Sequence, residues 1–318
     1  MRKSKNQTIL SFTTVLILSI VVGVIVWVPN FFVGYEAVRL WVSKIFAFLI
    51  TILSGTFIFL KNREMRFLKH ETIFPFLFSL LFIGLVSTGL SDTVDAPNMQ
   101  FNDGYIALIC TSLAFYRLIN KSDKFMTAWH CLECMLLLSA GSIFLPILWV
   151  YIPLFWIGME VFNKFNLRSL FASIMGLIAP YLIALSIFYL GDYQDAICQF
   201  YNHVDQSYTV ELPSGFYAWA SLIIITISSI ICLGSLLSQH DDRRYIHWIN
   251  NFSAIILFVS IILNIIFFGG GLLTISTAFW ATFLLTFHYS TTNTTLSKIY
   301  FWILLIASLG VIVMKMAV

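Results

Sequence analysis

Charged residues are scarce in this sequence. Lys, Arg, Asp and Glu together make up 10% of its 318 residues, whereas hydrophobic residues make up 59%. Soluble domains carry about 25% charged residues. No polar segment reaches the roughly 40 residues that a domain needs to bury a core unaided. The sequence therefore excludes a water-soluble domain. It predicts an all-α, polytopic integral membrane protein in which residues 1–318 form a single transmembrane helical domain.

Cysteine is also scarce, and the five cysteines do not form a disulfide framework, because their count is odd and four fall in predicted spans. Cys131 and Cys134 form a C-x-x-C beside His130, but no second C-x-x-C or His pair accompanies them. A structural zinc site needs about four such ligands. We therefore expect no metal and no cofactor. The net charge of +3 is modest, so we also expect no nucleic-acid partner.

Long apolar runs are what the sequence has in abundance. One transmembrane helix needs about 20 predominantly apolar residues, and eleven runs come close to that length. The fourth and the tenth are the weakest by length. The runs lie near residues 9–29, 41–60, 72–90, 104–119, 126–144, 146–163, 169–190, 215–238, 249–268, 271–288 and 299–316.

The basic residues predict the orientation of these spans. If the N-terminus lies inside, 15 of the 18 Lys and Arg residues fall in inside loops or at inside ends. Such a bias over short loops is the positive-inside signal of a membrane protein. It also supports the number of spans, because one miscounted helix would move every later loop to the other face. The prediction is a multi-pass protein of the cell inner membrane, with its N-terminus inside.

Carboxylates gather in the predicted outer loops, where a lipid-linked donor would present its phosphate. An enzyme acting on such a donor needs a general base for the acceptor hydroxyl and positive charge for the departing phosphate. The candidate catalytic bases are Glu36, Asp92 and Asp95. The candidate phosphate- or lipid-binding residues are Arg39, Lys44 and His203. The alternative is that Arg39 and Lys44 only extend to the membrane interface and that the carboxylates of the loops are merely solvated.

Two carboxylates fall inside apolar runs. Leu145 and Pro146 predict a turn between two short spans, because Pro cannot donate to a continuing helix and restricts the residue before it. A hairpin at this turn places Glu133 opposite Glu160, with His130 one helical turn from Glu133 on the same face. An ionisable residue within a span is a candidate for function. The alternatives are a satisfied structural pair and, for Glu160, a side chain that reaches the interface to pair with nearby basic residues.

Residues 145–190 contain a short Pro-containing hairpin, a basic F-x-x-F-x-L-R turn and a G-L-x-x-P-Y span. The motif residues are Phe162, Phe165, Leu167, Arg168, Gly176, Leu177, Pro180 and Tyr181. In this block the chain resembles a family of uncharacterised polytopic membrane proteins from Bacteroidota. The resemblance covers the central third well, and the flanks agree by hydropathy. It implies an inner-membrane protein of a Gram-negative cell.

The short hairpins and the acidic first outer loop are also similar to the C-type glycosyltransferases, which depend on lipid-phosphate sugars. This similarity implies a cell-envelope glycan enzyme with membrane lipids and a polyprenyl-phosphate-linked sugar as partners. Those enzymes usually show an acidic pair in the first outer loop, whereas this loop has Glu36 alone. Two alternatives stay open. One is a non-enzymatic subunit that binds a membrane protein partner, and the other is a transporter or flippase with a relay through Glu133, Glu160 and His130.

Overall fold

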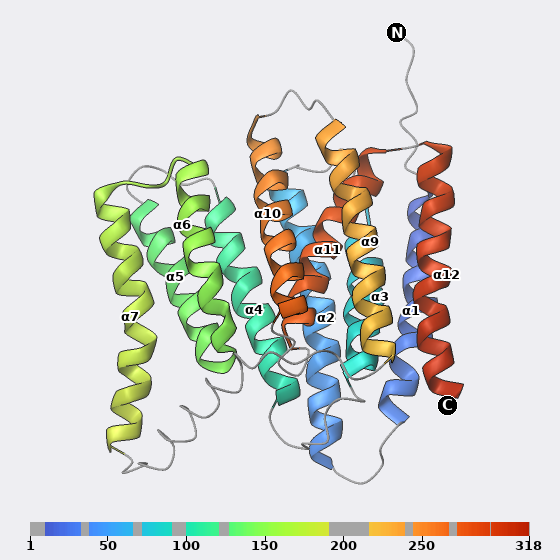
Figure 1. Ribbon diagram of the computed structural model, residues 1–318, viewed down its shortest axis with the longest axis horizontal. Coiled ribbons are helices and arrows are strands. Elements are labelled where there is room, and N and C mark those ends of the chain that lie inside the picture. Colours follow the sequence, from blue (N-terminus) through green and yellow to red (C-terminus); the bar gives the residue numbers. More distant parts are fainter. Residues whose placement is uncertain are drawn as a thin grey trace. The chain divides into compact units, whose positions relative to one another are not determined.

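The computed structural model describes residues 10–32, 38–65, 72–90, 100–120, 127–190, 216–238, 244–266, 272–292 and 294–317. All regular secondary structure in these ranges is helical, as the sequence predicts (Figure 1). Eleven α-helices occur there, and each coincides with one of the predicted apolar runs. They are α1 (Phe12–Phe32), α2 (Val38–Met65), α3 (Phe74–Leu90), α4 (Gln100–Ile119), α5 (Thr127–Phe144), α6 (Tyr151–Val161), α7 (Leu167–Leu190), α9 (Phe216–Ser238), α10 (Arg244–Ile266), α11 (Leu272–Thr291) and α12 (Thr295–Ala317).

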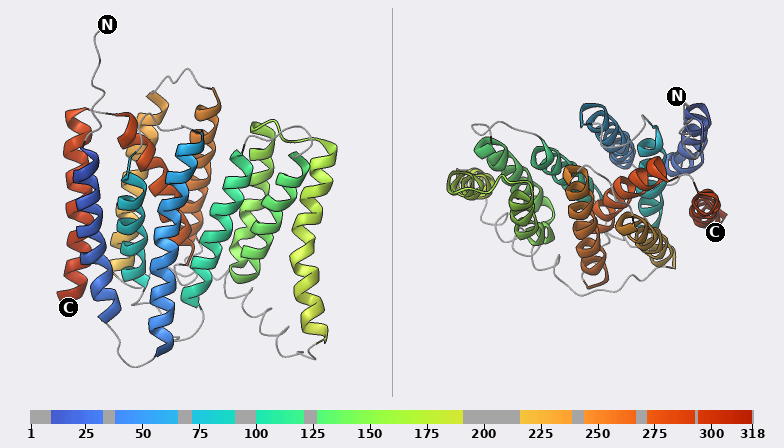
Figure 2. Two further views of the ribbon diagram at one scale, coloured as in Figure 1. Left: turned by 180° about the vertical axis from the view of Figure 1, so that it is seen from behind. Right: turned by 90° about the horizontal axis from the view of Figure 1, so that it is seen from above.

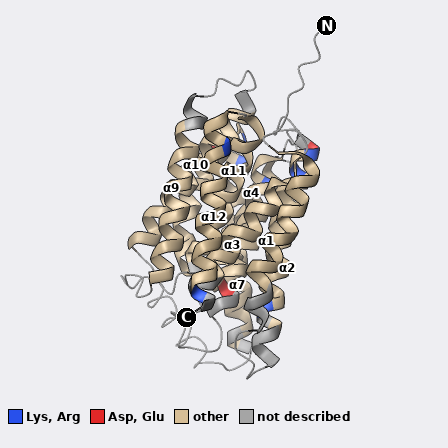
Figure 3. Ribbon diagram, turned by 90° about the vertical axis from the view of Figure 1, so that its right-hand side faces the viewer, with Lys and Arg blue, Asp and Glu red and all other residues tan. Residues whose placement is uncertain are grey.

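Six of these helices are long and apolar enough to cross a membrane. They are α2, α5, α7, α9, α10 and α12. Figure 3 shows the Lys, Arg, Asp and Glu residues of the described helices mainly towards helix ends, with long uncharged stretches between them. A bilayer accepts this pattern because charge is costly in its apolar centre. The chain is therefore a multi-pass membrane protein.

The chain divides into two compact units. Unit 1 comprises Met1–Asp95, Pro213–Asp242 and Thr277–Val318, and unit 2 comprises Ala96–Leu212 and Arg243–Ser276. Unit 1 thus holds α1, α2, α3, α9, α12 and most of α11, whereas unit 2 holds α4 to α7 and α10. Each unit has a packed interior of its own. That residues 1–318 act as one helical domain stays a prediction.

Unit 1 is arranged around α3, which packs against α1, α2, α9 and α12. Its core is aromatic. The rings of Phe74, Phe78, Tyr289 and Phe301 are all buried, and their centroids lie 5.4–6.2 Å apart in every pair. Aromatic pairs at this spacing add to the stability gained from burial. This part of unit 1 is a packed interior.

Unit 2 is arranged around α5, which packs against α4, α6 and α7. In Figure 2 the yellow-green α7 lies beside the green α5. After α5, Leu145 is extended, and Pro146 begins a short 3-10 helix, η1 (Pro146–Val150), that leads directly into α6. The predicted turn at Leu145 and Pro146 is therefore confirmed. It lets α5 and α6 pack on each other as the hairpin required.

The turn from α6 to α7 is fixed by its backbone. Asn163 is left-handed, with φ of 54°, and Asn is one of the few residues that tolerate this conformation. The N–H of Asn163 donates to the carbonyl of Glu160 at 2.9 Å, and the N–H of Lys164 donates to that of Met159 at 2.7 Å. These two bonds form a Schellman motif, which satisfies the last carbonyls of α6. They also fix the point at which the chain presents Lys164.

Candidate functional site

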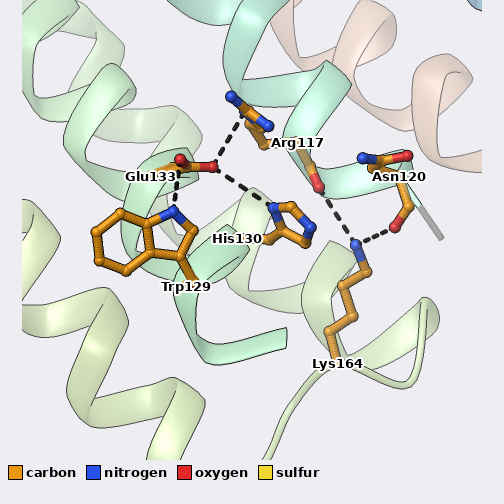
Figure 4. A network of polar contacts seen from close by, with 6 residues as sticks. All are labelled: Arg117, Asn120, Trp129, His130, Glu133 and Lys164. Carbon is orange, nitrogen blue, oxygen red and sulfur yellow. Dashed lines mark hydrogen bonds and ion pairs between the residues drawn. The ribbon is translucent and has the colours of Figure 1, made fainter. Parts of the chain in front are cut away.

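Glu133 is the centre of a charged cluster in unit 2 (Figure 4). The indole Nε1 of Trp129 donates to Glu133 Oε1 at 2.7 Å. Arg117 Nε forms an ion pair with Oε2 at 3.1 Å, and His130 Nδ1 lies 3.5 Å from the same oxygen. Both carboxylate oxygens therefore have partners. The predicted placement of His130 and Glu133 on one face of α5 is confirmed by their contact.

Lys164 joins this cluster to the end of α4. Its side chain is buried, and its ammonium group donates to the carbonyl of Asn120 at 2.6 Å and to that of Arg117 at 3.2 Å. The last carbonyls of a helix lack intrahelical donors, and a cation there also interacts favourably with the helix dipole. Lys164 thus holds the α6–α7 turn against the C-terminal end of α4. The charged cluster comprises Arg117, Asn120, Trp129, His130, Glu133 and Lys164.

The cluster lies near helix ends. Arg117 is two residues before Ile119, the last residue of α4, and Glu133 is six residues after Thr127, the first residue of α5. At a rise of about 1.5 Å per residue, Glu133 is roughly 9 Å from the start of its helix. A carboxylate at this depth can pair with interfacial cations. The cluster therefore satisfies Glu133 close to the ends of the helices that carry it.

Glu160 is placed differently. It lies on α6 with its side chain exposed, and it is not part of the charged cluster. Its backbone carbonyl accepts from Asn163 in the α6–α7 turn. Among the described residues, no ion pair involves its carboxylate. The structure thus brings together two of the three residues predicted as an intramembrane polar cluster, His130 and Glu133.

A second polar contact surface joins α5 and η1 to α7, and it carries no charge. Ser139 Oγ donates to the carbonyl of Leu177 at 2.6 Å. The hydroxyl of Tyr181 accepts from Trp149 Nε1 at 2.6 Å and lies 2.6 Å from Ser142 Oγ. We call this set, with Gly176, the neutral seam. Hydroxyl and indole groups pair here without the desolvation cost of a charge.

The G-L-x-x-P-Y motif supplies much of the neutral seam. A side chain at Gly176 would collide with the carbonyl oxygen of Leu132, so only Gly allows α7 to approach α5 this closely. Pro180 lies inside α7 and has no N–H to donate to the carbonyl four residues earlier, that of Gly176. The carbonyl of the next residue, Leu177, accepts the hydroxyl of Ser139. The motif residues at 176, 177 and 181 therefore pack and bond α7 onto α5 and η1.

The residues predicted at the outer face lie mostly outside the described ranges. These are Glu36, Asp92, Asp95 and His203. Arg39 belongs to the first turn of α2, and its side chain is not described. Lys44 lies further along α2 and is half-buried. Their roles as bases and phosphate ligands stay predictions.

The C-x-x-C residues are buried in unit 2. Cys131 and Cys134 are each at most 1% exposed, and Cys131 Sγ lies 4.0 Å from the carbonyl oxygen of Lys164. Within the part of the chain that the structure describes, no three His, Cys, Asp or Glu residues are grouped so that they could hold a metal ion. Here the two thiols pack as small hydrophobic side chains do.

The sequence did not predict that Arg117 and Trp129 pair with Glu133. Arg117 counts there only as an inside basic residue, and Lys164 as one of the basic residues near Glu160. A signal existed for Arg117, because the short connection between α4 and α5 keeps the end of one helix near the start of the next.

Comparison of the chain with protein-family models, with curated proteins and with solved structures found no match.

Proposed function

We propose that the chain is an eleven-span protein of the cell inner membrane, with its N-terminus inside, and that its chemistry lies at the outer face. There it would act as a cell-envelope glycan enzyme of the C-type glycosyltransferase class, using a polyprenyl-phosphate-linked sugar. Glu36, Asp92 or Asp95 would serve as general base, and Arg39, Lys44 or His203 would bind the phosphate.

Contacts within each unit support the proposed topology. In unit 2, Lys164 follows the inside end of α6 and binds the inside end of α4. In unit 1, the hydroxyl of Tyr217 at the outside end of α9 donates to the carbonyl of Met314 near the outside end of α12, at 3.4 Å. Helix ends that the proposed topology places on the same side of the membrane therefore contact each other, as alternating spans require.

The observation that carries the outer-face proposal is the pairing of Glu133. Trp129 and Arg117 occupy its two oxygens, at the end of unit 2 where the basic residues gather. A carboxylate held in this way is a structural anchor, so a transmembrane relay through Glu133 is not favoured. The carboxylates of the outer loops are then the candidates for chemistry, as the similarity to C-type glycosyltransferases implies.

A transfer assay tests this proposal. The purified full chain is reconstituted in liposomes with a radiolabelled polyprenyl-phosphate sugar, and release of sugar to acceptor or water is measured. We expect turnover with the unmodified chain and a loss of at least about a hundredfold with the variant at the true base, since general bases contribute roughly that much. The variants are Glu36→Gln, Asp92→Asn and Asp95→Asn. Glu160→Gln, an exposed carboxylate of α6, is the control. No turnover, or equal turnover in all variants, would contradict the proposal.

Labelling of Cys198 tests the topology independently of activity. Cys198 is the cysteine that the sequence places in an outer loop, whereas Cys131, Cys134 and Cys232 are buried. A membrane-impermeant maleimide should therefore modify Cys198 in intact spheroplasts. A Cys198→Ser variant should stay unmodified. Labelling of Cys198 only after lysis would reverse the proposed orientation.

The surface of α7 favours a second candidate, a non-enzymatic subunit of a membrane protein assembly. Of the apolar 18-residue stretch of α7, only 11% is buried inside the protein. The corresponding stretches of the other five long apolar helices are 33–56% buried. If this face binds a partner helix, Leu182→Asn and Phe171→Asn should abolish copurification of that partner. Both side chains are exposed, at 58% and 61%. Purification of the chain alone from native membranes in mild detergent would count against this candidate.

A further inference from the structure

Arg117 has donors that the charged cluster does not use. A guanidinium group carries five N–H donors, and Glu133 is the one described residue that forms an ion pair with it, through Nε. The Arg117 side chain is also 39% exposed. We propose that this end of unit 2 binds the phosphate of an anionic phospholipid, with the guanidinium group of Arg117 as the principal donor.

The charge of the cluster fits an anion. Arg117 and Lys164 contribute two permanent cations, and Glu133 contributes one carboxylate, so one positive charge remains with His130 neutral. Lys164 is buried and donates to backbone carbonyls. Arg117 is therefore the cation of the cluster that is exposed at the protein surface.

Trp129 indicates that the phosphate belongs to a lipid. Its side chain is 58% exposed, and its N–H is committed to Glu133, so the ring itself faces the surroundings. Trp side chains prefer the depth of the lipid head groups, and Arg117 lies two residues from the end of α4, close to that depth. Basic sites between transmembrane helices are a known setting for anionic head groups. A free phosphate ion would make no use of the exposed indole ring.

Native mass spectrometry of the full chain tests the proposal. The protein is taken from nanodiscs of phosphatidylcholine alone or with added phosphatidylglycerol, and retained lipids are counted. We expect selective retention of phosphatidylglycerol and a binding constant about tenfold weaker in Arg117→Gln, the size of one charge-assisted hydrogen bond. Lys298→Gln is the control, because Lys298 is an exposed cation in the first turn of α12 and should not affect binding.

Glu133→Gln separates lipid binding from a merely structural role. Loss of the carboxylate raises the local positive charge, so phosphatidylglycerol should bind about threefold more tightly even if the protein becomes less stable. Equal retention by Arg117→Gln and the unmodified chain would overturn the proposal. The proposal would also be overturned if the unmodified chain retained both lipids equally. The same holds if inorganic phosphate stabilised the protein and phosphatidylglycerol did not. If Arg117→Gln does not fold, unchanged or weaker binding by Glu133→Gln overturns it. The proposal requires only membrane insertion and is independent of the outer-face activity.

Discussion

Helix α5 forms two kinds of polar contact, and they differ along its length. Its first turns carry the charged cluster, where Glu133 pairs with Arg117 of α4, and Lys164 of the α6–α7 turn binds the end of α4. Its later turns carry the neutral seam, where Ser139 and Ser142 bond to α7. The charged groups lie nearer the first residue of α5, whereas the contacts nearer its last residue use uncharged groups, which cost less to desolvate. One helix thus holds different neighbours, through charged contacts near one end and neutral contacts near the other.

The close approach in the neutral seam is the feature whose disruption should cost most. Gly176→Ala places a Cβ against the carbonyl oxygen of Leu132, which is backbone and cannot rotate away. Helices α5 and α7 must separate, and the seam bonds lengthen. We expect a loss of about 3 kcal/mol in the free energy of unfolding, measured by SDS titration. The control is Gly310→Ala in α12, where a Cβ meets nothing within 4 Å. Equal effects at the two positions would contradict the close packing of α5 and α7.

The buried ammonium of the charged cluster should come next. Lys164→Met leaves the carbonyls of Arg117 and Asn120 without this donor in a buried place. We expect a loss of about 2 kcal/mol, typical of unsatisfied buried polar groups. The same SDS titration provides the measurement. Lys298→Met, at an exposed position of α12, should leave the unfolding curve unchanged.

The two carboxylates of the predicted polar cluster can be compared directly. Glu133→Gln removes the ion pair with Arg117 but keeps an acceptor for Trp129, so we expect a loss of about 1 kcal/mol for this partly exposed pair. Glu160→Gln should have no measurable effect, because its side chain is exposed and outside the cluster. Melting temperatures in one nanodisc composition would show the difference. A larger shift for Glu160→Gln would mean that the wrong carboxylate has been assigned to the cluster.

Loss of one hydroxyl of the neutral seam should have the smallest effect. Tyr181→Phe removes the acceptor of Trp149, whereas Ser142 keeps its bond to the carbonyl of Ser139. Interhelical hydrogen bonds in membranes average about 0.6 kcal/mol, and we expect a loss of that size. Tyr189→Phe, an exposed position of the same helix, is the matched control and should behave like the unmodified protein. A loss as large as that of Lys164→Met would remove the distinction between the two regions.

Hydropathy predicted much of the fold. Apolar runs located every described helix, and six of these helices are long and apolar enough to span a bilayer. Proline chemistry located the turn at Leu145 and Pro146. The left-handed Asn163 was not predicted, because Asn occurs in many backbone conformations and the sequence around it carries no Gly to mark the turn. The division into two units also depends on packing between distant segments, which periodicity does not reveal.

The candidate site was predicted less completely than the fold. Helical spacing alone placed His130 beside Glu133. Arg117 and Lys164 lie on other helices or turns, so their contacts depend on tertiary packing. The G-L-x-x-P-Y motif was used as a sign of family resemblance, and its Gly176 and Tyr181 turn out to attach α7 to α5 and η1. A motif can therefore be distinctive because packing demands it, without taking part in chemistry.

The bond from Lys164 to the end of α4 also bears on how the protein is made. The two carbonyls it binds lie 44 and 47 residues earlier in the chain. Until the ribosome has passed Lys164, the end of α4 lacks this partner. Helices α4, α5 and α6 can therefore reach their final arrangement only after the α6–α7 turn has been synthesised. Chains that stop before this residue should be recognised as unfinished by membrane quality-control proteases.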